Sequence, residues 1–84
     1  MNPKSIRLFI KPSCPWCDEA IEWLQTREIP FESIDVTQDP TAYAEMVALT
    51  GQRKAPCLEA DDEVLADFGV DELEEWWQEM GYTN

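Results

Sequence analysis

Two cysteines, Cys14 and Cys17, stand three positions apart in the segment KPSCPWCDEA, with Pro15 and Trp16 between them. Such a pair could bind a metal, close a structural disulfide or exchange thiols with a substrate disulfide. A closed zinc site needs four ligands, and the chain offers three cysteines and no histidine. A disulfide across so short a loop would remove little chain entropy. We therefore expect no metal and favour thiol–disulfide exchange.

The residues around the pair favour that chemistry. Apolar residues recur at helical spacing from Cys17 to Leu24, and Pro15 suits the first turn of a helix. Cys14 would then cap the helix and face free backbone N–H groups, which stabilise a thiolate. Cys17 would lie one turn further in, on the apolar face. We expect Cys14 to attack a substrate disulfide and the shielded Cys17 to resolve the mixed disulfide.

Strand and helix patterns alternate around this motif. Strands are expected at 6–10, 31–36, 55–60 and 64–68, and helices from Pro15 to the stop at Ile29–Pro30, over 40–50, and over 71–81. Asp71 is expected to cap the last helix, with Glu74 completing a capping-box-like pair. The order βαβαββα predicts one α/β domain over residues 1–84. Its mixed four-stranded sheet would be flanked by helices, with the first two strands parallel and the last two forming a hairpin.

The charge of the chain limits its partners. Eighteen acids and six bases give a net charge of −12, which disfavours nucleic acid and anionic membranes as partners. The sequence has no membrane-length apolar stretch and no signal-peptide pattern, so we expect a cytoplasmic monomer. Three of the bases, Lys11, Arg53 and Lys54, lie beside the segments CPWC and APC. Such a basic rim would favour an anionic ligand.

These motifs resemble those of the glutaredoxins, within the thioredoxin fold, over nearly the whole chain. CPWC is close to the family's CPYC, GQRKAPCLEA matches the segment that ends in Thr-Val-Pro, and ADFGVDEL matches the Gly-Gly-x-Asp-Asp-Leu segment. The resemblance implies a thioredoxin-like fold. It also implies that glutathione, as co-substrate, supports the reduction of disulfide-containing or glutathionylated proteins.

The resemblance further implies a set of residues that contact glutathione. In that family Lys11 and Trp16 would flank the tripeptide, and the backbone of Ala55 would pair with its cysteinyl part. Pro56 would be the cis-proline beside the active site. Val70 would supply backbone contacts, and Asp71 would meet the amino end of glutathione.

Some residues depart from the glutaredoxin pattern. Phe68 replaces the first glycine, whose lack of a side chain allows a ligand to approach the backbone. Ala55-Pro56 and the turn from Phe68 to Asp71 resemble the redoxins that serve ribonucleotide reductase and draw electrons from thioredoxin reductase. CPWC and Arg53-Lys54 favour the glutathione-dependent interpretation, and the redoxin interpretation remains the alternative.

Two further questions stay open at the level of sequence. Some glutaredoxins carry a [2Fe–2S] cluster between two protomers, and here Cys14 and glutathione would be its ligands; Pro15 and the nearby Cys17 disfavour that function. The third cysteine, Cys57, follows the expected cis-proline. It would be either a small buried hydrophobic residue or an exposed thiol near the active site.

Overall fold

The computed structural model describes residues 2–82, so the ends of the predicted 1–84 domain, residue 1 and residues 83–84, lie outside it. Its elements follow in the order β1 (Ile6–Ile10), α1 (Pro15–Thr26), β2 (Glu32–Asp35), α2 (Pro40–Thr50), β3 (Cys57–Ala60), β4 (Glu63–Ala66) and α3 (Val70–Glu79). The predicted order βαβαββα is confirmed. No helix among these residues is long and apolar enough to cross a membrane.

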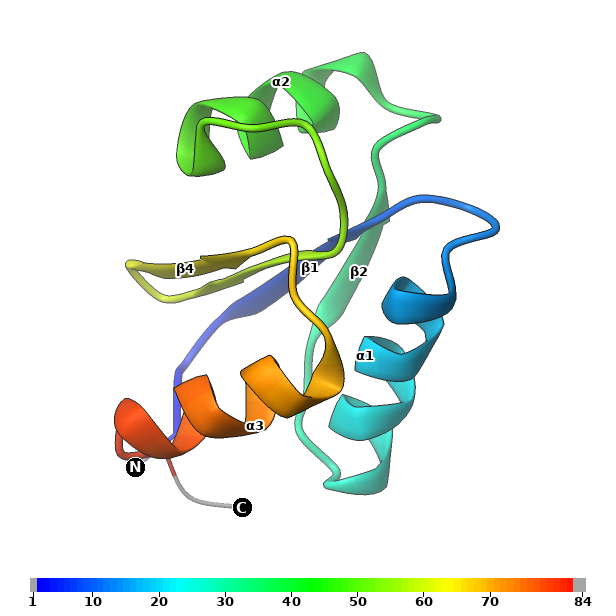
Figure 1. The fold of residues 1–84 in the computed structure, drawn as a ribbon. Coiled ribbons are helices and arrows are strands. Elements are labelled where there is room, and N and C mark those ends of the chain that lie inside the picture. Colours follow the sequence, from blue (N-terminus) through cyan, green and yellow to red (C-terminus); the bar gives the residue numbers. More distant parts are fainter. Residues whose placement is uncertain (1, 83–84) are drawn as a thin grey trace.

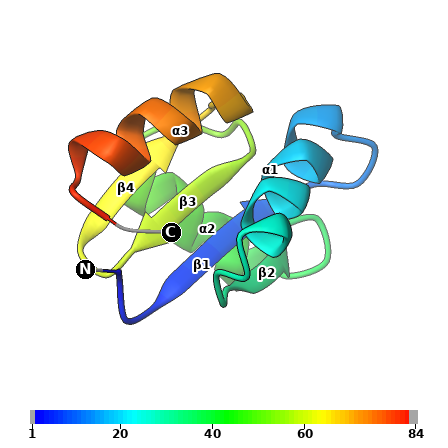
Figure 2. The ribbon, with the colours of Figure 1, turned by 90° about the horizontal axis from the view of Figure 1, so that it is seen from below.

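The four strands form one mixed sheet in the order β2-β1-β3-β4. As predicted, β1 pairs in parallel with β2, and β3 forms an antiparallel hairpin with β4. The central pair, β1 and β3, is antiparallel and places Phe9 opposite Cys57. Helices α1 and α3 cover one face of the sheet and α2 covers the other (Figures 1 and 2).

Successive side chains of β1 point to opposite faces of the sheet, and each face has its own hydrophobic core. Leu8 packs on the side of α1 and α3, in a cluster that includes Leu24, Leu58 and Leu73. The next residue, Phe9, packs on the side of α2, in a smaller cluster with Val36, Met46 and Cys57. Because both faces of β1 are buried, its sequence is a continuous apolar run apart from Arg7.

The first helix ends earlier than the sequence indicates. It stops at Thr26 because Glu28 adopts a left-handed conformation with a φ of 57°. The N–H of Ile29 then donates to the carbonyl of Leu24, and that of Glu28 donates to the carbonyl of Gln25. This is the hydrogen-bond pattern of a Schellman motif with a non-glycine residue at its left-handed position.

The predicted cap of the last helix is wrong by two residues. Gly69, not Asp71, is the N-cap of α3, and Asp71 lies inside the first turn. The carboxylate of Glu72 accepts a hydrogen bond of 2.9 Å from the backbone N–H of Gly69, so the reciprocal contact comes from Glu72. Glu74 instead pairs with Arg27, the C-cap of α1, at 3.2 Å. The helix starts earlier because a side chain three residues along can satisfy the N–H group of the cap.

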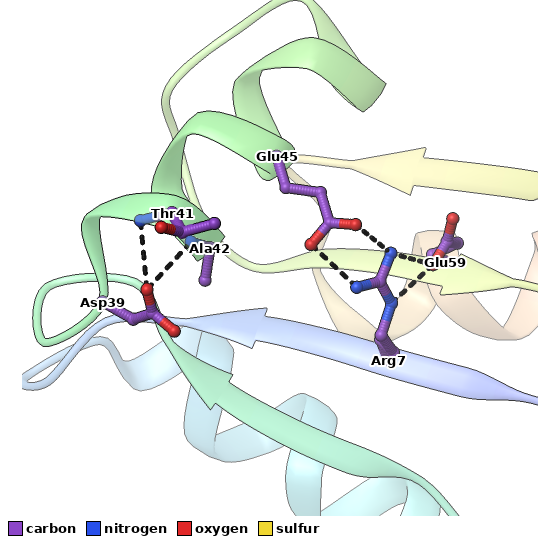
Figure 3. A network of polar contacts seen from close by, with 6 residues as sticks. All are labelled: Arg7, Asp39, Thr41, Ala42, Glu45 and Glu59. Carbon is purple, nitrogen blue, oxygen red and sulfur yellow. Dashed lines mark hydrogen bonds and ion pairs between the residues drawn. The ribbon is translucent and has the colours of Figure 1, made fainter.

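Arg7 joins α2 to the sheet. Its Nη1 and Nη2 donate to the two carboxylate oxygens of Glu45 at 2.8 and 2.9 Å, and its Nε donates to Glu59 at 2.7 Å. Asp39 caps the same helix by accepting from the N–H groups of Thr41 and Ala42 (Figure 3). These contacts fix the first two turns of α2 over the sheet.

The contact between Arg7 and Glu45 predicts a pH-dependent contribution to stability. The hydrogen bonds from Arg7 lower the pKa of Glu45, because they outweigh desolvation. A folded-state pKa below the unfolded value gives stability that is complete above the unfolded pKa and is lost as pH falls through the folded one. The stability advantage of the native chain over Glu45→Gln should therefore shrink as the pH is lowered from neutral through about 4.5, the ordinary pKa of a glutamate, and below it.

Chemical denaturation of both proteins across that pH range tests this prediction. Glu79→Gln, which removes an exposed carboxylate of α3, controls for the loss of one negative charge. An advantage over Glu45→Gln that stays constant with pH would contradict the proposed role of the ion pair.

Candidate active site

Cys14 occupies the N-cap of α1, as the sequence predicts. Its backbone is extended, with φ −117° and ψ 100°, and Pro15 takes the first helical position. The N–H of Cys17 donates to Sγ of Cys14 at 3.1 Å. This sulfur, which is half-buried, lies at the positive end of the helix dipole and already accepts a backbone hydrogen bond. Both interactions stabilise negative charge on Cys14, which is what a nucleophilic thiolate requires.

Cys17 lies one turn deeper and is 1% exposed. Burial, followed by the hydrogen bond to the side chain of Cys14, raises the pKa of Cys17 to about 12, although a backbone hydrogen bond from Lys11 opposes the shift. Cys17 is therefore a protonated, shielded thiol at neutral pH. All three cysteines are free thiols, so the structure represents the reduced pair.

A largely apolar hollow of about 470 Å³ opens beside Cys14, lined in part by Lys11, Pro12, Pro15, Trp16 and Ala55. The side chain of Trp16 is 50% exposed, so its ring is available to a ligand. Three predicted contact residues, Lys11, Trp16 and Ala55, thus share one surface with the candidate nucleophile. Pro56 is buried behind Ala55, and the Ala55–Pro56 peptide is cis.

The predicted basic rim lies on one side of this hollow. Nζ of Lys11 donates to the backbone carbonyl of Arg53 at 2.8 Å and lies 6.0 Å from the ring centroid of Tyr43. The side chains of Arg53 and Lys54 are exposed. The ammonium group of Lys11 is thus held against the loop that carries Arg53 and Lys54. Lys11 therefore places one positive charge on the wall of the hollow, and the loop that it contacts carries two more.

Val70 and Asp71, the other two predicted contact residues, lie in the first turn of α3. Val70 lines a separate hollow of about 440 Å³ together with Glu19, Glu22 and Trp23 of α1. Asp71 lines a third hollow with Glu74 and Glu75. Neither residue lines the hollow beside Cys14, but the turn before them contacts the loop that forms one wall of it, since the N–H of Asp67 donates to the carbonyl of Pro56 at 2.9 Å.

Phe68 does not fill the hollow beside Cys14. Its side chain is 1% exposed and belongs to the core between the sheet and helices α1 and α3. The backbone N–H of the next residue, Gly69, is occupied by the carboxylate of Glu72. The departure from the Gly-Gly pattern is thus an additional core side chain, and a capping contact takes up the adjacent N–H group.

The described cysteines differ in their access to a metal. In residues 2–82, no group of three or more histidine, cysteine, aspartate or glutamate side chains is arranged to hold a metal ion. Cys17 and Cys57 are each 1% exposed, which leaves Cys14 as the accessible sulfur. An iron–sulfur cluster bound to Cys14 would therefore draw its remaining thiolates from other molecules.

Gln52 was not predicted from the sequence, although its side chain binds the backbone of the loop that carries Ala55. Its Oε1 accepts from the backbone N–H of Lys54 at 2.6 Å, and its Nε2 donates to Sγ of Cys57 at 3.1 Å. A single glutamine between two elements has no periodicity and matches no motif, so the sequence contains no signal that would single it out. Cys57 is the buried residue that one of the two interpretations described.

Comparisons with known proteins agree with this geometry. The family model described as Glutaredoxin matches residues 6–65. A glutaredoxin-like 8.6 kDa protein in the rubredoxin operon of Clostridium pasteurianum is 29% identical over 69 residues, which cover 82% of this chain and 92% of the relative. The glutaredoxin-like protein NrdH of Lactococcus lactis is 31% identical over 68 residues, which cover 81% of this chain and 93% of the relative.

Solved structures of thioredoxin-like and glutaredoxin-like proteins also match the chain. A mutant of the thioredoxin-like protein BC3987 superposes with a TM-score of 0.79 at 27% identity, covering 89% of this chain and 96% of that one. The NrdH-redoxin of Escherichia coli, which is described as a glutaredoxin-like protein with a thioredoxin-like activity profile, superposes with a TM-score of 0.71. It is 27% identical, and the match covers 84% of this chain and 92% of that one. The thioredoxin-like fold is thereby confirmed.

Proposed function

Because the chain belongs to the glutaredoxin family and is a thiol–disulfide oxidoreductase, we propose that Cys14 and Cys17 reduce protein disulfides by a dithiol mechanism. One observation carries the assignment of roles. Sγ of Cys14 is partly accessible at the start of α1, where the N–H of Cys17 donates to it, whereas the Cys17 thiol itself is buried. The accessible sulfur is therefore the nucleophile and the buried sulfur is the resolving thiol.

The proposed reaction proceeds in two exchanges. The thiolate of Cys14 attacks one sulfur of the substrate disulfide, the substrate S–S bond breaks, and the departing thiolate takes a proton from solvent. Cys17 then loses its proton and attacks Sγ of Cys14. The mixed disulfide breaks, and the second substrate thiolate leaves and is protonated. Two electrons pass to the substrate, and the protein is left with a Cys14–Cys17 disulfide.

For the return of these electrons we favour thioredoxin reductase as the reductant. The relative from Lactococcus lactis and the matched Escherichia coli structure are both NrdH proteins. Phe68 takes the place of the first glycine of the glutaredoxin Gly-Gly pair, and the N–H of Gly69 is already bound by the carboxylate of Glu72. Ribonucleotide reductase, which such redoxins serve, is the corresponding candidate substrate.

Glutathione is the second candidate reductant, and one observation favours it. Lys11, Trp16 and Ala55 line a single hollow with Cys14, and Arg53 and Lys54 add positive charge nearby. An anionic tripeptide disulfide could approach Cys14 along that surface.

A reduction assay on the oxidised protein separates the two reductants. One reaction contains NADPH and thioredoxin reductase, and the other contains NADPH, glutathione and glutathione reductase. We expect NADPH consumption in the first reaction only, because relatives that match most of the chain are NrdH proteins and Phe68 replaces a glycine of the glutathione-binding pattern. Asp71→Asn should leave the rate of NADPH consumption with thioredoxin reductase unchanged. Reduction by glutathione alone, together with a loss of rate in Asp71→Asn, would instead assign the protein to the glutathione-dependent branch.

A further inference from the structure

The loop from Gln52 to Pro56 joins α2 to β3 and supplies one wall of the hollow beside Cys14. Ala55 lines that hollow, and Arg53 and Lys54 project from the same loop. The loop has no regular helix or strand hydrogen bonds of its own. Its shape must therefore be held by other contacts, because a substrate chain can align with Ala55 only if that residue is fixed relative to Cys14.

Side chains provide those contacts. The amide of Gln52 spans the loop: its Oε1 accepts from the N–H of Lys54 at 2.6 Å, and its Nε2 donates to the carbonyl of Lys54 at 3.0 Å. The same Nε2 donates to Sγ of Cys57 at 3.1 Å. Both backbone polar groups of Lys54, the residue directly before Ala55, are thus bound by one side chain.

The thiol of Cys57 completes the network. Its Sγ donates to the carbonyl of Lys54 at 3.0 Å while it accepts from Gln52. Cys57 is 1% exposed, and burial raises the pKa of its thiol, so the proton needed for this donation stays in place at neutral pH. A hydrophobic residue of similar size would fill the same space but would leave the carbonyl of Lys54 with one partner fewer.

We propose that Gln52 and Cys57 are positioning residues that hold the Lys54–Ala55 segment in place for a polypeptide substrate whose disulfide Cys14 attacks. This inference rests on the proposed function. Neither residue touches the reacting sulfur atoms. Their effect is confined to substrates that extend along the loop, and a small disulfide without a peptide backbone does not depend on it.

The test compares two probe disulfides. Reduced Cys57→Ala, Cys57→Ser and Gln52→Ala are each reacted with insulin, a polypeptide disulfide, and with 2,2′-dithiodipyridine, a small aromatic one. Cys57→Ala and Gln52→Ala each remove more than one hydrogen bond of the network, and each should lower the rate constant on insulin by at least about fivefold. The rate constant on dithiodipyridine should be unchanged. Cys57→Ser, which keeps a donor and an acceptor, should restore the insulin rate.

The controls separate this inference from the proposed function. Gln25→Ala, an exposed substitution on α1, should match the native chain on both probes. Equal losses on both probes would mean that the network merely supports Cys14, and an unchanged insulin rate would mean that the loop needs no such support; either result overturns the inference. If Cys14→Ser still reduced insulin, the proposed function itself would fail, whatever the loop variants did.

Discussion

Replacing Cys14 with serine should abolish disulfide reduction, with a loss of more than about a thousandfold in rate. The serine hydroxyl can occupy the same N-cap and accept the same backbone hydrogen bond, so α1 should remain intact. A neutral hydroxyl cannot replace a thiolate as the attacking group, because the N-terminus of a helix does not deprotonate serine at neutral pH. The fold and the cap are kept, and only the nucleophile is lost.

Insulin reduction by the reduced protein measures this effect, and circular dichroism verifies that the fold is retained. Ser33→Ala, an exposed change on the edge strand β2, is the matched control and should show native activity. Appreciable turnover by Cys14→Ser would place the nucleophile elsewhere in the chain and would remove the basis of the mechanism.

Replacing Cys17 with serine should have a different effect. The first exchange needs only Cys14, so a mixed disulfide with the substrate should form in a single turnover. The second exchange should stop, because the buried sulfur that resolves the intermediate is absent. We expect reduction of protein disulfides to fall by at least about a hundredfold in this variant. Removal of glutathione from glutathionylated peptides, in which added glutathione can act as the resolving thiol, should survive.

Non-reducing electrophoresis with mass spectrometry detects the trapped adduct between Cys17→Ser and insulin. The double variant with Cys14→Ser is the control and should form no adduct. Normal insulin turnover by Cys17→Ser would show that an external thiol resolves the intermediate, and the dithiol mechanism would then be wrong.

Much of the fold could be predicted because its signals are local and periodic. The apolar run of β1 and both ends of α2, predicted over 40–50 and observed over Pro40–Thr50, lie where the sequence predicts them. The errors in the prediction lie at helix ends whose positions are determined by individual side chains. Gly69 replaces Asp71 as a cap because Glu72 folds back on its N–H. Glu28 ends α1 in a left-handed conformation that glycine usually occupies.

In the candidate site, too, some features could be predicted from local sequence signals and others could not. Cys14 and Cys17 could be placed from sequence because the start of a helix fixes one at its end and the other on its inner face. The relation between Lys11 and the carbonyl of Arg53 joins residues far apart in the chain, and no spacing rule predicts it. The hydrogen bond from the N–H of Asp67 to the carbonyl of Pro56, which ties the turn before α3 to the loop beside Cys14, likewise follows no spacing rule. Such three-dimensional relations need the coordinates.

The central claim is that Cys14 is the reactive thiol of the pair and that Cys17 is shielded. Alkylation of the reduced, unmodified protein with a limiting amount of iodoacetamide at neutral pH tests this claim directly, with fragmentation mass spectrometry to locate the adduct. Burial and the hydrogen bond to Cys14 raise the pKa of Cys17 well above its ordinary value, so Cys17 is protonated at pH 7 and reacts slowly. A single adduct on Cys14 is the predicted result. First modification of Cys17 or Cys57 would contradict the account.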